Sequence, residues 1–263
     1  MDLGLKGKSI LITGGNRGVG FSIACAFARE GAHVAICARN TDVLETAVQQ
    51  IREIGAKAAA FSVDLFTTEG CIEAIAATVR AFGGLDVLVN NASTNIGGRL
   101  EELTDEQLTE RFMGKTLASM RCCRAALPFL RESNAGRIVC IGGTSARMVA
   151  PSSLPGGLGN SSLVNFAKHL SNDVAPDAIT VNVIHPSFTK TDRYPDRLAA
   201  RATERGLTLE AAGASFAAEF PIGRIVEPTD IAPLVLFLAS PHASAITGQA
   251  IAVDGGSTPC VSY

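Results

Sequence analysis

Short runs of aliphatic and β-branched residues alternate with longer amphipathic segments along the whole sequence. This alternation predicts parallel strands joined by helical crossovers, because a tight hairpin cannot connect two parallel strands. The expected strands are residues 9–13, 33–37, 58–63, 85–89, 137–141, 179–184 and 250–253. The expected helices are residues 18–29, 42–54, 71–82, 104–130, 161–174 and 229–238.

These elements predict an α/β fold in which a seven-stranded parallel sheet carries helices on both faces. With right-handed crossovers this is a doubly wound, Rossmann-type arrangement. No internal repeat or low-complexity linker divides residues 1–263, so we expect a single domain. Residues 189–222 lack strand character and are expected to form a helical flap over the carboxyl edge of the sheet.

The composition excludes several classes of protein. The formal net charge is −2, so the chain lacks the basic excess that nucleic acids or anionic membranes attract, and neither is an expected partner. No apolar run reaches the roughly 18 residues that a membrane-spanning helix needs, and no signal peptide is recognisable. The seven cysteines include no C-x-x-C pair, which favours buried thiols in a reducing cytoplasm over disulfides or a metal site.

A glycine-rich turn links the first expected strand to the first expected helix. The residues from Thr13 to Gly20 read Thr-Gly-Gly-Asn-Arg-Gly-Val-Gly. Glycines at this place let backbone N–H groups approach a pyrophosphate at the positive end of the helix. The strand before the turn and the helix after it favour a nucleotide site over a purely structural turn.

Several motifs, in order, resemble those of the short-chain dehydrogenase/reductase (SDR) family. Residues 13–20 are similar to its T-G-x-x-x-G-x-G turn, and residues 90–93, Asn-Asn-Ala-Ser, resemble its N-N-A-G strand end with Ser93 in place of glycine. Residues 253–256, Val-Asp-Gly-Gly, resemble its C-terminal signature. The resemblance covers nearly the whole chain and implies one NAD(P)-binding Rossmann domain that acts as an oxidoreductase on a small molecule.

The resemblance also implies which positions contact the cofactor. They are Gly14, Asn16, Arg17, Gly18, Val19, Gly20, Arg39, Asp64, Leu65, Asn91, Ala92, Pro186, Phe188 and Thr191. An acidic residue after the second strand would bind the ribose 2′-hydroxyl and repel a 2′-phosphate, but this chain has Ala38 and Arg39 there. With Arg17 in the glycine turn, two guanidinium groups favour NADP(H) over NAD(H), unless both arginines are simply solvated.

The usual catalytic residues of the family are absent from the sequence. SDR catalysis uses a Tyr-x-x-x-Lys motif, but Tyr194 is followed four residues later by Leu198, and the other tyrosine, Tyr263, ends the chain. Alignment on the flanking motifs places other residues at the family's Asn, Ser, Tyr and Lys positions: Lys115, Gly143, Gly156 and Asn160. Glycine cannot donate a proton, and an amide cannot supply the cation that lowers the pKa of a phenol.

Two titratable residues are candidate substitutes for the missing acid. His185 precedes the last cofactor loop, and Tyr194 lies in the expected flap. Each also has a structural interpretation, His185 as a packed histidine beside the sheet and Tyr194 as a packed flap residue. Ser145, Ser152 and Ser153 carry hydroxyls, although serines in such a loop are usually turn formers.

Two further expectations concern helices near the site. Gly156, Gly157 and Gly159 should weaken a first helical turn, so the helix is expected to begin near Asn160 or Ser161. In the flap, arginines recur every four residues from Arg193 to Arg205 and are expected to form a solvated face with salt bridges.

Three functions are compatible with this sequence. The favoured one is an NADP(H)-binding SDR protein with altered chemistry on a small molecule: an atypical reduction, or a non-redox isomerisation, cyclisation or elimination. The alternatives are a non-catalytic nucleotide-binding sensor or partner subunit, and a conventional NADP-dependent carbonyl reductase. The resemblance also implies a homotetramer or homodimer assembled through the helices expected at residues 104–130 and 161–174.

A double substitution tests the assignment of the catalytic positions. In the Gly156→Tyr, Asn160→Lys variant we expect faster carbonyl reduction, because the phenol and its neighbouring cation are restored. The measurement is NADPH oxidation with a panel of ketones and aldehydes, with the wild type as control. An unchanged rate would show that the substrate pocket itself differs from that of the family.

Overall fold

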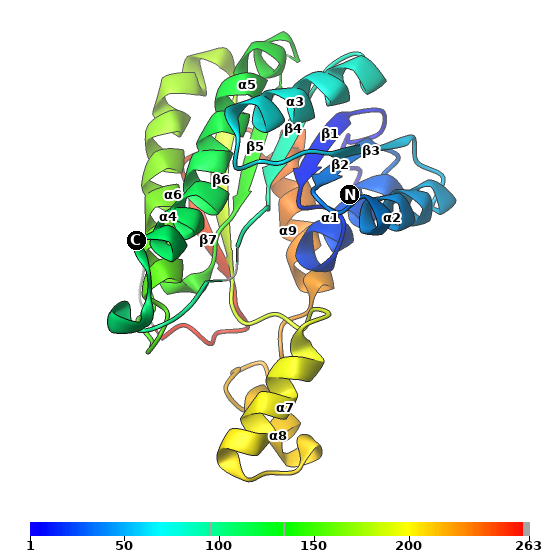
Figure 1. Ribbon diagram of the computed structural model, residues 1–263. Coiled ribbons are helices and arrows are strands. Elements are labelled where there is room, and N and C mark those ends of the chain that lie inside the picture. The colour runs from blue at the N-terminus through cyan, green and yellow to red at the C-terminus, as the bar shows by residue number, and fades with distance from the viewer. Residues whose placement is uncertain (95, 134, 260–263) are drawn as a thin grey trace.

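A single parallel sheet organises the chain. The computed structural model describes residues 1–94, 96–133 and 135–259, so Tyr263 lies outside the described residues. The strand order is β3-β2-β1-β4-β5-β6-β7, with every neighbouring pair parallel, which confirms the predicted doubly wound fold (Figure 1). The strands are β1 (Ser9–Thr13), β2 (His33–Ala38), β3 (Ala58–Ser62), β4 (Val87–Asn90), β5 (Arg137–Ile141), β6 (Thr180–Pro186) and β7 (Ala250–Val253).

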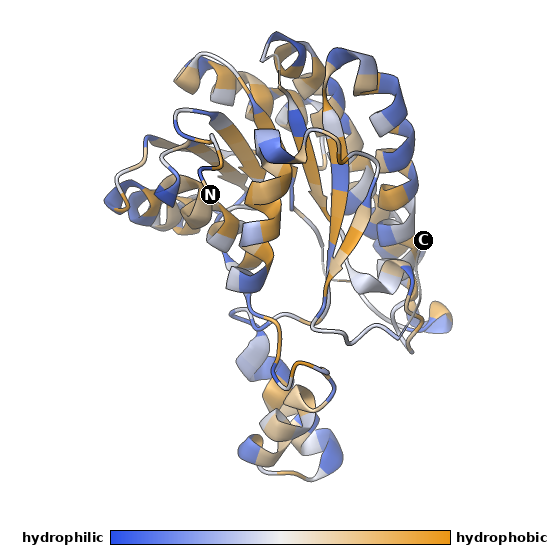
Figure 2. Cartoon of the chain, turned by 180° about the vertical axis from the view of Figure 1, so that it is seen from behind, coloured by the Kyte–Doolittle hydropathy of each residue, from blue (hydrophilic) through white to orange (hydrophobic). Residues whose placement is uncertain are grey.

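Helices cover both faces of the sheet. Helices α1 (Gly18–Arg29), α2 (Thr41–Glu53) and α9 (Pro228–Ala239) pack on one face, and α3 (Thr68–Phe82), α5 (Ala118–Glu132) and α6 (Leu154–Val174) pack on the other. The central strands read as almost continuous apolar runs because both faces are buried (Figure 2). Side chains therefore alternate between two cores, with Ile10 and Ile12 in the first and Leu11 in the second.

Helix α6 contradicts the prediction of a late start. It begins at Leu154 rather than near Asn160, and Gly156, Gly157 and Gly159 all lie within it. Pro155 occupies the first turn, where its fixed φ suits a helix and its missing N–H needs no partner. The Thr116 hydroxyl donates to the Gly159 carbonyl at 3.0 Å, so tertiary contacts offset the poor helix propensity of the glycines.

The helix predicted at residues 104–130 is interrupted. Helix α4 (Asp105–Phe112) continues into a π-helical turn over Met113–Leu117 before α5 begins. The turn buries Lys115, which is 4% exposed. Such turns widen a helix by one residue and are frequent at functional sites. The pattern of apolar residues does not distinguish this turn from a regular helix.

Residues 189–222 include two helices, α7 (Tyr194–Arg205) and α8 (Leu209–Ala217), which project from the carboxyl edge as a flap (Figure 1). The expected solvated arginine face is wrong for Arg201. Its side chain is only 11% exposed, pairs with Glu219 and lies 4.0 Å above the Phe216 ring. No helix of the described residues is long and apolar enough to cross a membrane.

Two adjacent glycines after α3, Gly83 and Gly84, differ in backbone conformation and so allow a matched test of stability. Gly83 has φ +84°, whereas Gly84 has no positive φ and nothing within 4 Å of an added Cβ. We expect Gly83→Ala to lower the free energy of unfolding by about 1–2 kcal/mol, because alanine is strained in the left-handed region. Gly84→Ala should raise it by up to about 1 kcal/mol by restricting the unfolded chain. Urea denaturation measures both, and equal effects would contradict the assigned conformations.

Candidate functional site

Hydrogen bonds between Thr13 and the residues that follow β4 hold the glycine turn against the end of that strand. The Thr13 hydroxyl accepts from the N–H groups of Asn91 and Ala92 at 2.9 and 3.0 Å. The Asn91 side-chain amide donates in return to the carbonyls of Thr13 and Gly14, both at 3.0 Å. These bonds join two neighbouring strands where both end, and so fix the floor of a site at the carboxyl edge.

Two glycines of the turn are required by close approach or by backbone conformation. A Cβ at Gly20 would lie 2.4 Å from both the Asn91 Nδ2 and the Gly14 carbonyl oxygen. Gly14 itself has φ +64°, a conformation that other residues rarely adopt. The turn thus leads closely into the N-terminus of α1, where the first backbone N–H groups of a helix can bind phosphates.

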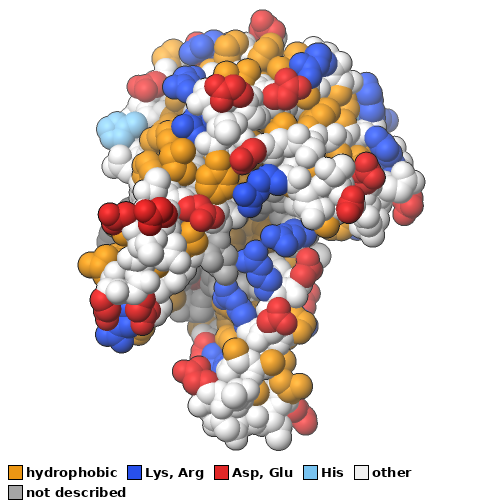
Figure 3. Space-filling view, in the orientation of Figure 1, with side chains coloured by type: hydrophobic (Ala, Val, Ile, Leu, Met, Phe, Trp, Pro, Cys, Tyr) orange, Lys and Arg blue, Asp and Glu red, His pale blue; other side chains and the backbone are white. Residues whose placement is uncertain are grey.

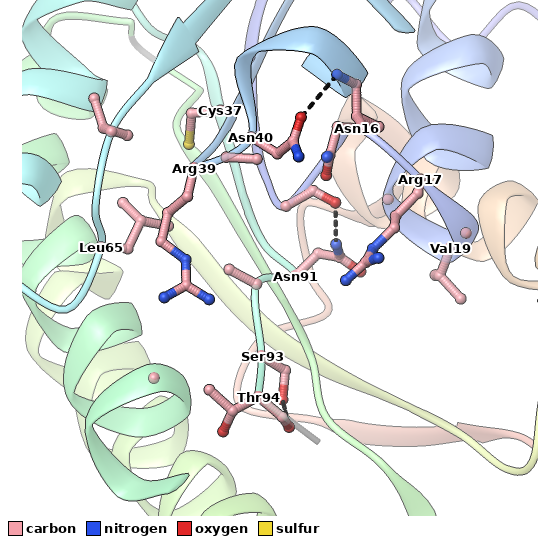
Figure 4. Close-up of a pocket in the computed structure, with 18 of the residues that line it drawn as sticks. Asn16, Arg17, Val19, Cys37, Arg39, Asn40, Leu65, Asn91, Ser93 and Thr94 are labelled. Carbon is pink, nitrogen blue, oxygen red and sulfur yellow. Dashed lines mark hydrogen bonds between the residues drawn. The ribbon is translucent and has the colours of Figure 1, made fainter. Parts of the chain in front are cut away.

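A cavity of about 530 Å³ lies along this edge (Figure 4). All the predicted cofactor positions except Pro186 and Phe188 line it. Phe188 lines a second cavity of about 200 Å³ beside the flap and stacks on Phe216, with ring centroids 4.9 Å apart. The other lining residues were not among the predicted cofactor contacts: Cys37, Ala38, Asn40, Val43, Val63, Phe66, Ser93, Thr94, Gly114, Asp192 and Arg193.

The cavity is bordered by cations. Figure 4 shows Arg17 and Arg39 reaching in from opposite sides, and Arg39 lies 5.3 Å from the centroid of the Phe66 ring. Among the residues that the structure describes, neither arginine forms an ion pair. In Figure 3, Lys and Arg side chains border the hollow between the body and the flap. The Asp64 carboxylate accepts from the Phe66 N–H at 3.0 Å.

The four residues predicted to replace the family's catalytic residues lie around one corner: Gly143 just after β5, Gly156 and Asn160 in the first turns of α6, and Lys115 in the π-helical turn. Asn160 is 4% exposed, and its amide donates to the Ser145 hydroxyl at 2.9 Å. A Cβ at Gly143 would approach the Asn160 Nδ2 to 2.8 Å, and one at Gly156 would lie 3.3 Å from the Ser145 Oγ. The two glycines thus leave room for an amide–hydroxyl pair.

Lys115 occupies the wall of this corner. Its ammonium donates to the carbonyl of Ile141 at the end of β5. Burial, together with the nearby Arg111 guanidinium, lowers the pKa of Lys115 to about 7. The amine therefore changes charge near neutral pH.

His185 packs beside the sheet, as its structural interpretation proposed. It is 2% exposed, and its Nδ1 accepts from the Gly143 N–H at 3.0 Å. That bond places the proton of the neutral ring on Nε2. Burial, with the charges of Arg147 and Lys115, lowers the pKa of His185 to about 4. The ring is therefore neutral at physiological pH.

Tyr194 is placed in the flap rather than in the corner. Its ring lies 6.3 Å from those of both Phe188 and Phe216, measured between centroids. Lys190 lies 5.7 Å from its centroid. In this structure Tyr194 therefore contributes to the packing of the flap.

Arg111 is the residue of this corner that sequence reasoning missed. Its Nη1 donates to the Ser93 hydroxyl at 2.8 Å and also to the Thr94 carbonyl. Its Nη2 would lie 3.7 Å from a Cβ at Gly156. The one available signal was its spacing, because Arg111 precedes Lys115 by four residues and so shares its helix face.

The comparisons with known proteins agree with this geometry. The sequence profile of a family described as "Enoyl-(Acyl carrier protein) reductase" matches residues 14–258. The 2,3-dihydro-2,3-dihydroxybenzoate dehydrogenase of Bacillus subtilis is 30% identical over 259 residues, which cover 97% of each chain.

Two solved structures with bound NADPH are similar in fold. The L-sorbose reductase of Gluconobacter frateurii, in complex with NADPH and L-sorbose, has a TM-score of 0.94 and 31% identity, and covers 99% of this chain and 100% of its own. A variant of actinorhodin polyketide ketoreductase with NADPH has a TM-score of 0.91 and 31% identity, and covers 96% of this chain and 98% of its own.

The fold and the glycine turn define a Rossmann-type protein with a nucleotide-binding edge. The match to the family profile over residues 14–258, with relatives at 30% identity and above over nearly the whole chain, shows the family. The chain belongs to the short-chain dehydrogenase/reductase family.

The buried amine of Lys115 predicts a pH-dependent stability. The unfolded lysine keeps its proton to about pH 10.4, whereas the folded one loses it near pH 7. Between these values the unfolded state binds more protons, so the free energy of unfolding should rise by about 2 kcal/mol from pH 7 to pH 9.

In Lys115→Met this contribution should disappear, and the variant should be the more stable protein at pH 7. Urea denaturation at pH 7, 8 and 9 measures it, with Lys6→Met at an exposed position as the matched control. Parallel stability curves for wild type and Lys115→Met would contradict a buried amine that titrates near neutrality.

Proposed function

We propose that this protein binds NADP(H) and transfers hydride between the nicotinamide and a small carbonyl or hydroxyl compound, with proton chemistry that differs from the Tyr–Lys scheme of its family. The observation that carries the proposal is the cavity at the carboxyl edge, in which Arg17 and Arg39 stand without ion-pair partners among the described residues. A 2′-phosphate is the group that would pair with such guanidinium groups.

The residues of the cavity fit a dinucleotide. The close approach at Gly20 and the positive φ of Gly14 keep backbone N–H groups open toward a pyrophosphate. Arg39, which lies over Phe66, presents a planar cation beside the ribose position after β2. When bound, the nicotinamide would supply or accept the hydride. The NADPH complexes of the two structural neighbours support this choice of cofactor.

The proton chemistry is the part that we propose to be altered. We assign Lys115, Gly143, Gly156 and Asn160 to the family's Asn, Ser, Tyr and Lys positions. Their convergence on one corner supports this assignment. The Asn160 side chain fills the space beside Gly143, and the Lys115 amine donates a hydrogen bond to the carbonyl of Ile141, the last residue of β5. Neither glycine carries an acid, so the group that protonates a substrate oxygen must come from elsewhere.

Cofactor discrimination tests the proposal. We expect a higher kcat/KM for NADPH than for NADH in the oxidation of reduced cofactor with a panel of ketones and aldehydes. Arg39→Ala should lower the NADPH/NADH preference by about tenfold, because one charge-assisted contact to the phosphate is lost. Arg29→Ala, at an exposed position on α1, should leave the preference unchanged.

Two results would redirect the assignment. NADPH binding without oxidation by any carbonyl would overturn hydride transfer and leave a non-redox reaction or a non-catalytic nucleotide-binding role. Equal affinity for NADPH and NADH, insensitive to Arg39→Ala, would overturn the choice of cofactor.

A further inference from the structure

Ser145 places a hydroxyl where the corner lacks a side chain. Its Oγ would lie 3.3 Å from a Cβ at Gly156, on the side of α6 that faces the short helical turn Thr144–Ala146 after β5. The hydroxyl accepts from the Asn160 amide at 2.9 Å, and no described residue accepts the Ser145 proton. A hydroxyl that accepts one hydrogen bond is polarised toward donating another. Ser145 is therefore left with a proton to donate.

Asn160 is held so that it orients this hydroxyl. The side chain is nearly fully buried, and its Nδ2 lies where any Cβ at Gly143 would collide at 2.8 Å. Its Oδ1 is buried and has no hydrogen-bond partner among the described residues, and neither has the Thr94 hydroxyl nearer the cofactor cavity. Each of these two atoms can therefore form a hydrogen bond with a further polar group in this region.

The charges around Ser145 favour negative charge on such a group. Arg111 brings its Nη2 to 3.7 Å from the Cβ position of Gly156, and Lys115 lies beyond it on the same helical run. None of the ion pairs among the described residues includes Arg111 or Lys115. The fixed guanidinium of Arg111, together with Lys115 when it is protonated, stabilises negative charge that develops on an oxygen during reaction.

We infer that Ser145 is the catalytic hydroxyl of this site, which donates to the oxygen of a small carbonyl substrate, and that Asn160 is its positioning residue. The inference rests on the proposed function. It explains why the family's Ser, Tyr and Lys positions differ together: Gly143 makes room for the Asn160 amide, Gly156 makes room for the Ser145 hydroxyl, and Asn160 joins the two.

In the reducing direction, the proton passes from the Ser145 hydroxyl to the carbonyl oxygen of the substrate. Addition of hydride to the carbonyl carbon moves the C=O π pair onto the oxygen. That oxygen takes the proton of the Ser145 hydroxyl, and the serine, which is half-buried, recovers a proton from solvent water. One carbonyl, one hydride and one solvent proton thus give one alcohol. Oxidation runs the same steps in reverse.

Paired serine variants test the inference on the full-length protein. Ser145→Ala removes the proposed donor. Ser161→Ala is the matched control, because the Ser161 hydroxyl also links α6 to the loop after β5, through the Ala146 carbonyl at 3.0 Å, but is exposed. The probe is ethyl acetoacetate. Its affinity for the NADP⁺-loaded protein is measured by calorimetry, and its reduction by NADPH oxidation.

We expect Ser145→Ala to bind the probe about fivefold more weakly, by the loss of one hydrogen bond, and to reduce it about 100-fold more slowly. NADPH affinity should stay within about twofold, which also reports correct folding, and Ser161→Ala should match the wild type throughout. If Asn160 acts only through Ser145, the single variant Asn160→Ala should reduce the probe more slowly than the wild type. The double variant Ser145→Ala, Asn160→Ala should then differ from Ser145→Ala by less than about twofold in the reduction rate.

The outcomes separate the two levels of the assignment. Reduction that Ser145→Ala leaves unchanged overturns the inference and keeps the proposed function. Probe binding that depends on Ser145 without any reduction keeps the contact and overturns hydride transfer. A wild type that neither binds nor reduces the probe overturns both. An Asn160→Ala effect that persists undiminished in the Ser145→Ala background makes Asn160 a purely structural residue.

Discussion

The link between Thr13 and Asn91 is the contact on which the site depends. β1 and β4 are neighbours at the centre of the sheet, where the strand order changes direction along the chain. Their ends are locked by the Thr13 hydroxyl and the Asn91 amide, with four hydrogen bonds of about 3 Å between them. The glycine turn is thereby held open, and the cavity forms at the switch point, where doubly wound sheets bind their ligands.

The corner beyond that cavity combines two glycines with polar groups from other elements. Glycines at positions 143 and 156 create the room, and Asn160 and Ser145 occupy it as a hydrogen-bonded pair. The π-helical turn then brings Lys115 to the end of β5. The corner therefore contains an amide, a hydroxyl and an amine, from Asn160, Ser145 and Lys115.

Much of the fold followed from the sequence, since buried parallel strands and capped amphipathic helices leave strong local patterns. The bounds predicted for β1, β5, β7 and α1 are those observed. The start of α6 and the π-helical turn were not predictable, because glycine propensity is outweighed there by contacts such as that of Thr116 with Gly159. For the same local reason the sequence located the glycine turn that lines the cavity, whereas the positions of Arg111 and Ser145 depend on distances between elements far apart in the sequence.

The flap carries its own small aromatic core. Phe188 stacks on Phe216, Tyr194 packs beside both, and Arg201 lies over Phe216 while it pairs with Glu219. Most of these contacts lie within residues 188–219, and the three aromatic rings also pack against the core on the α1 and α9 face of the sheet. Substitutions at Tyr194 and Arg197 on α7 can therefore reshape the cavity of about 200 Å³ beside the flap without touching the hydrogen bonds between Thr13 and Asn91.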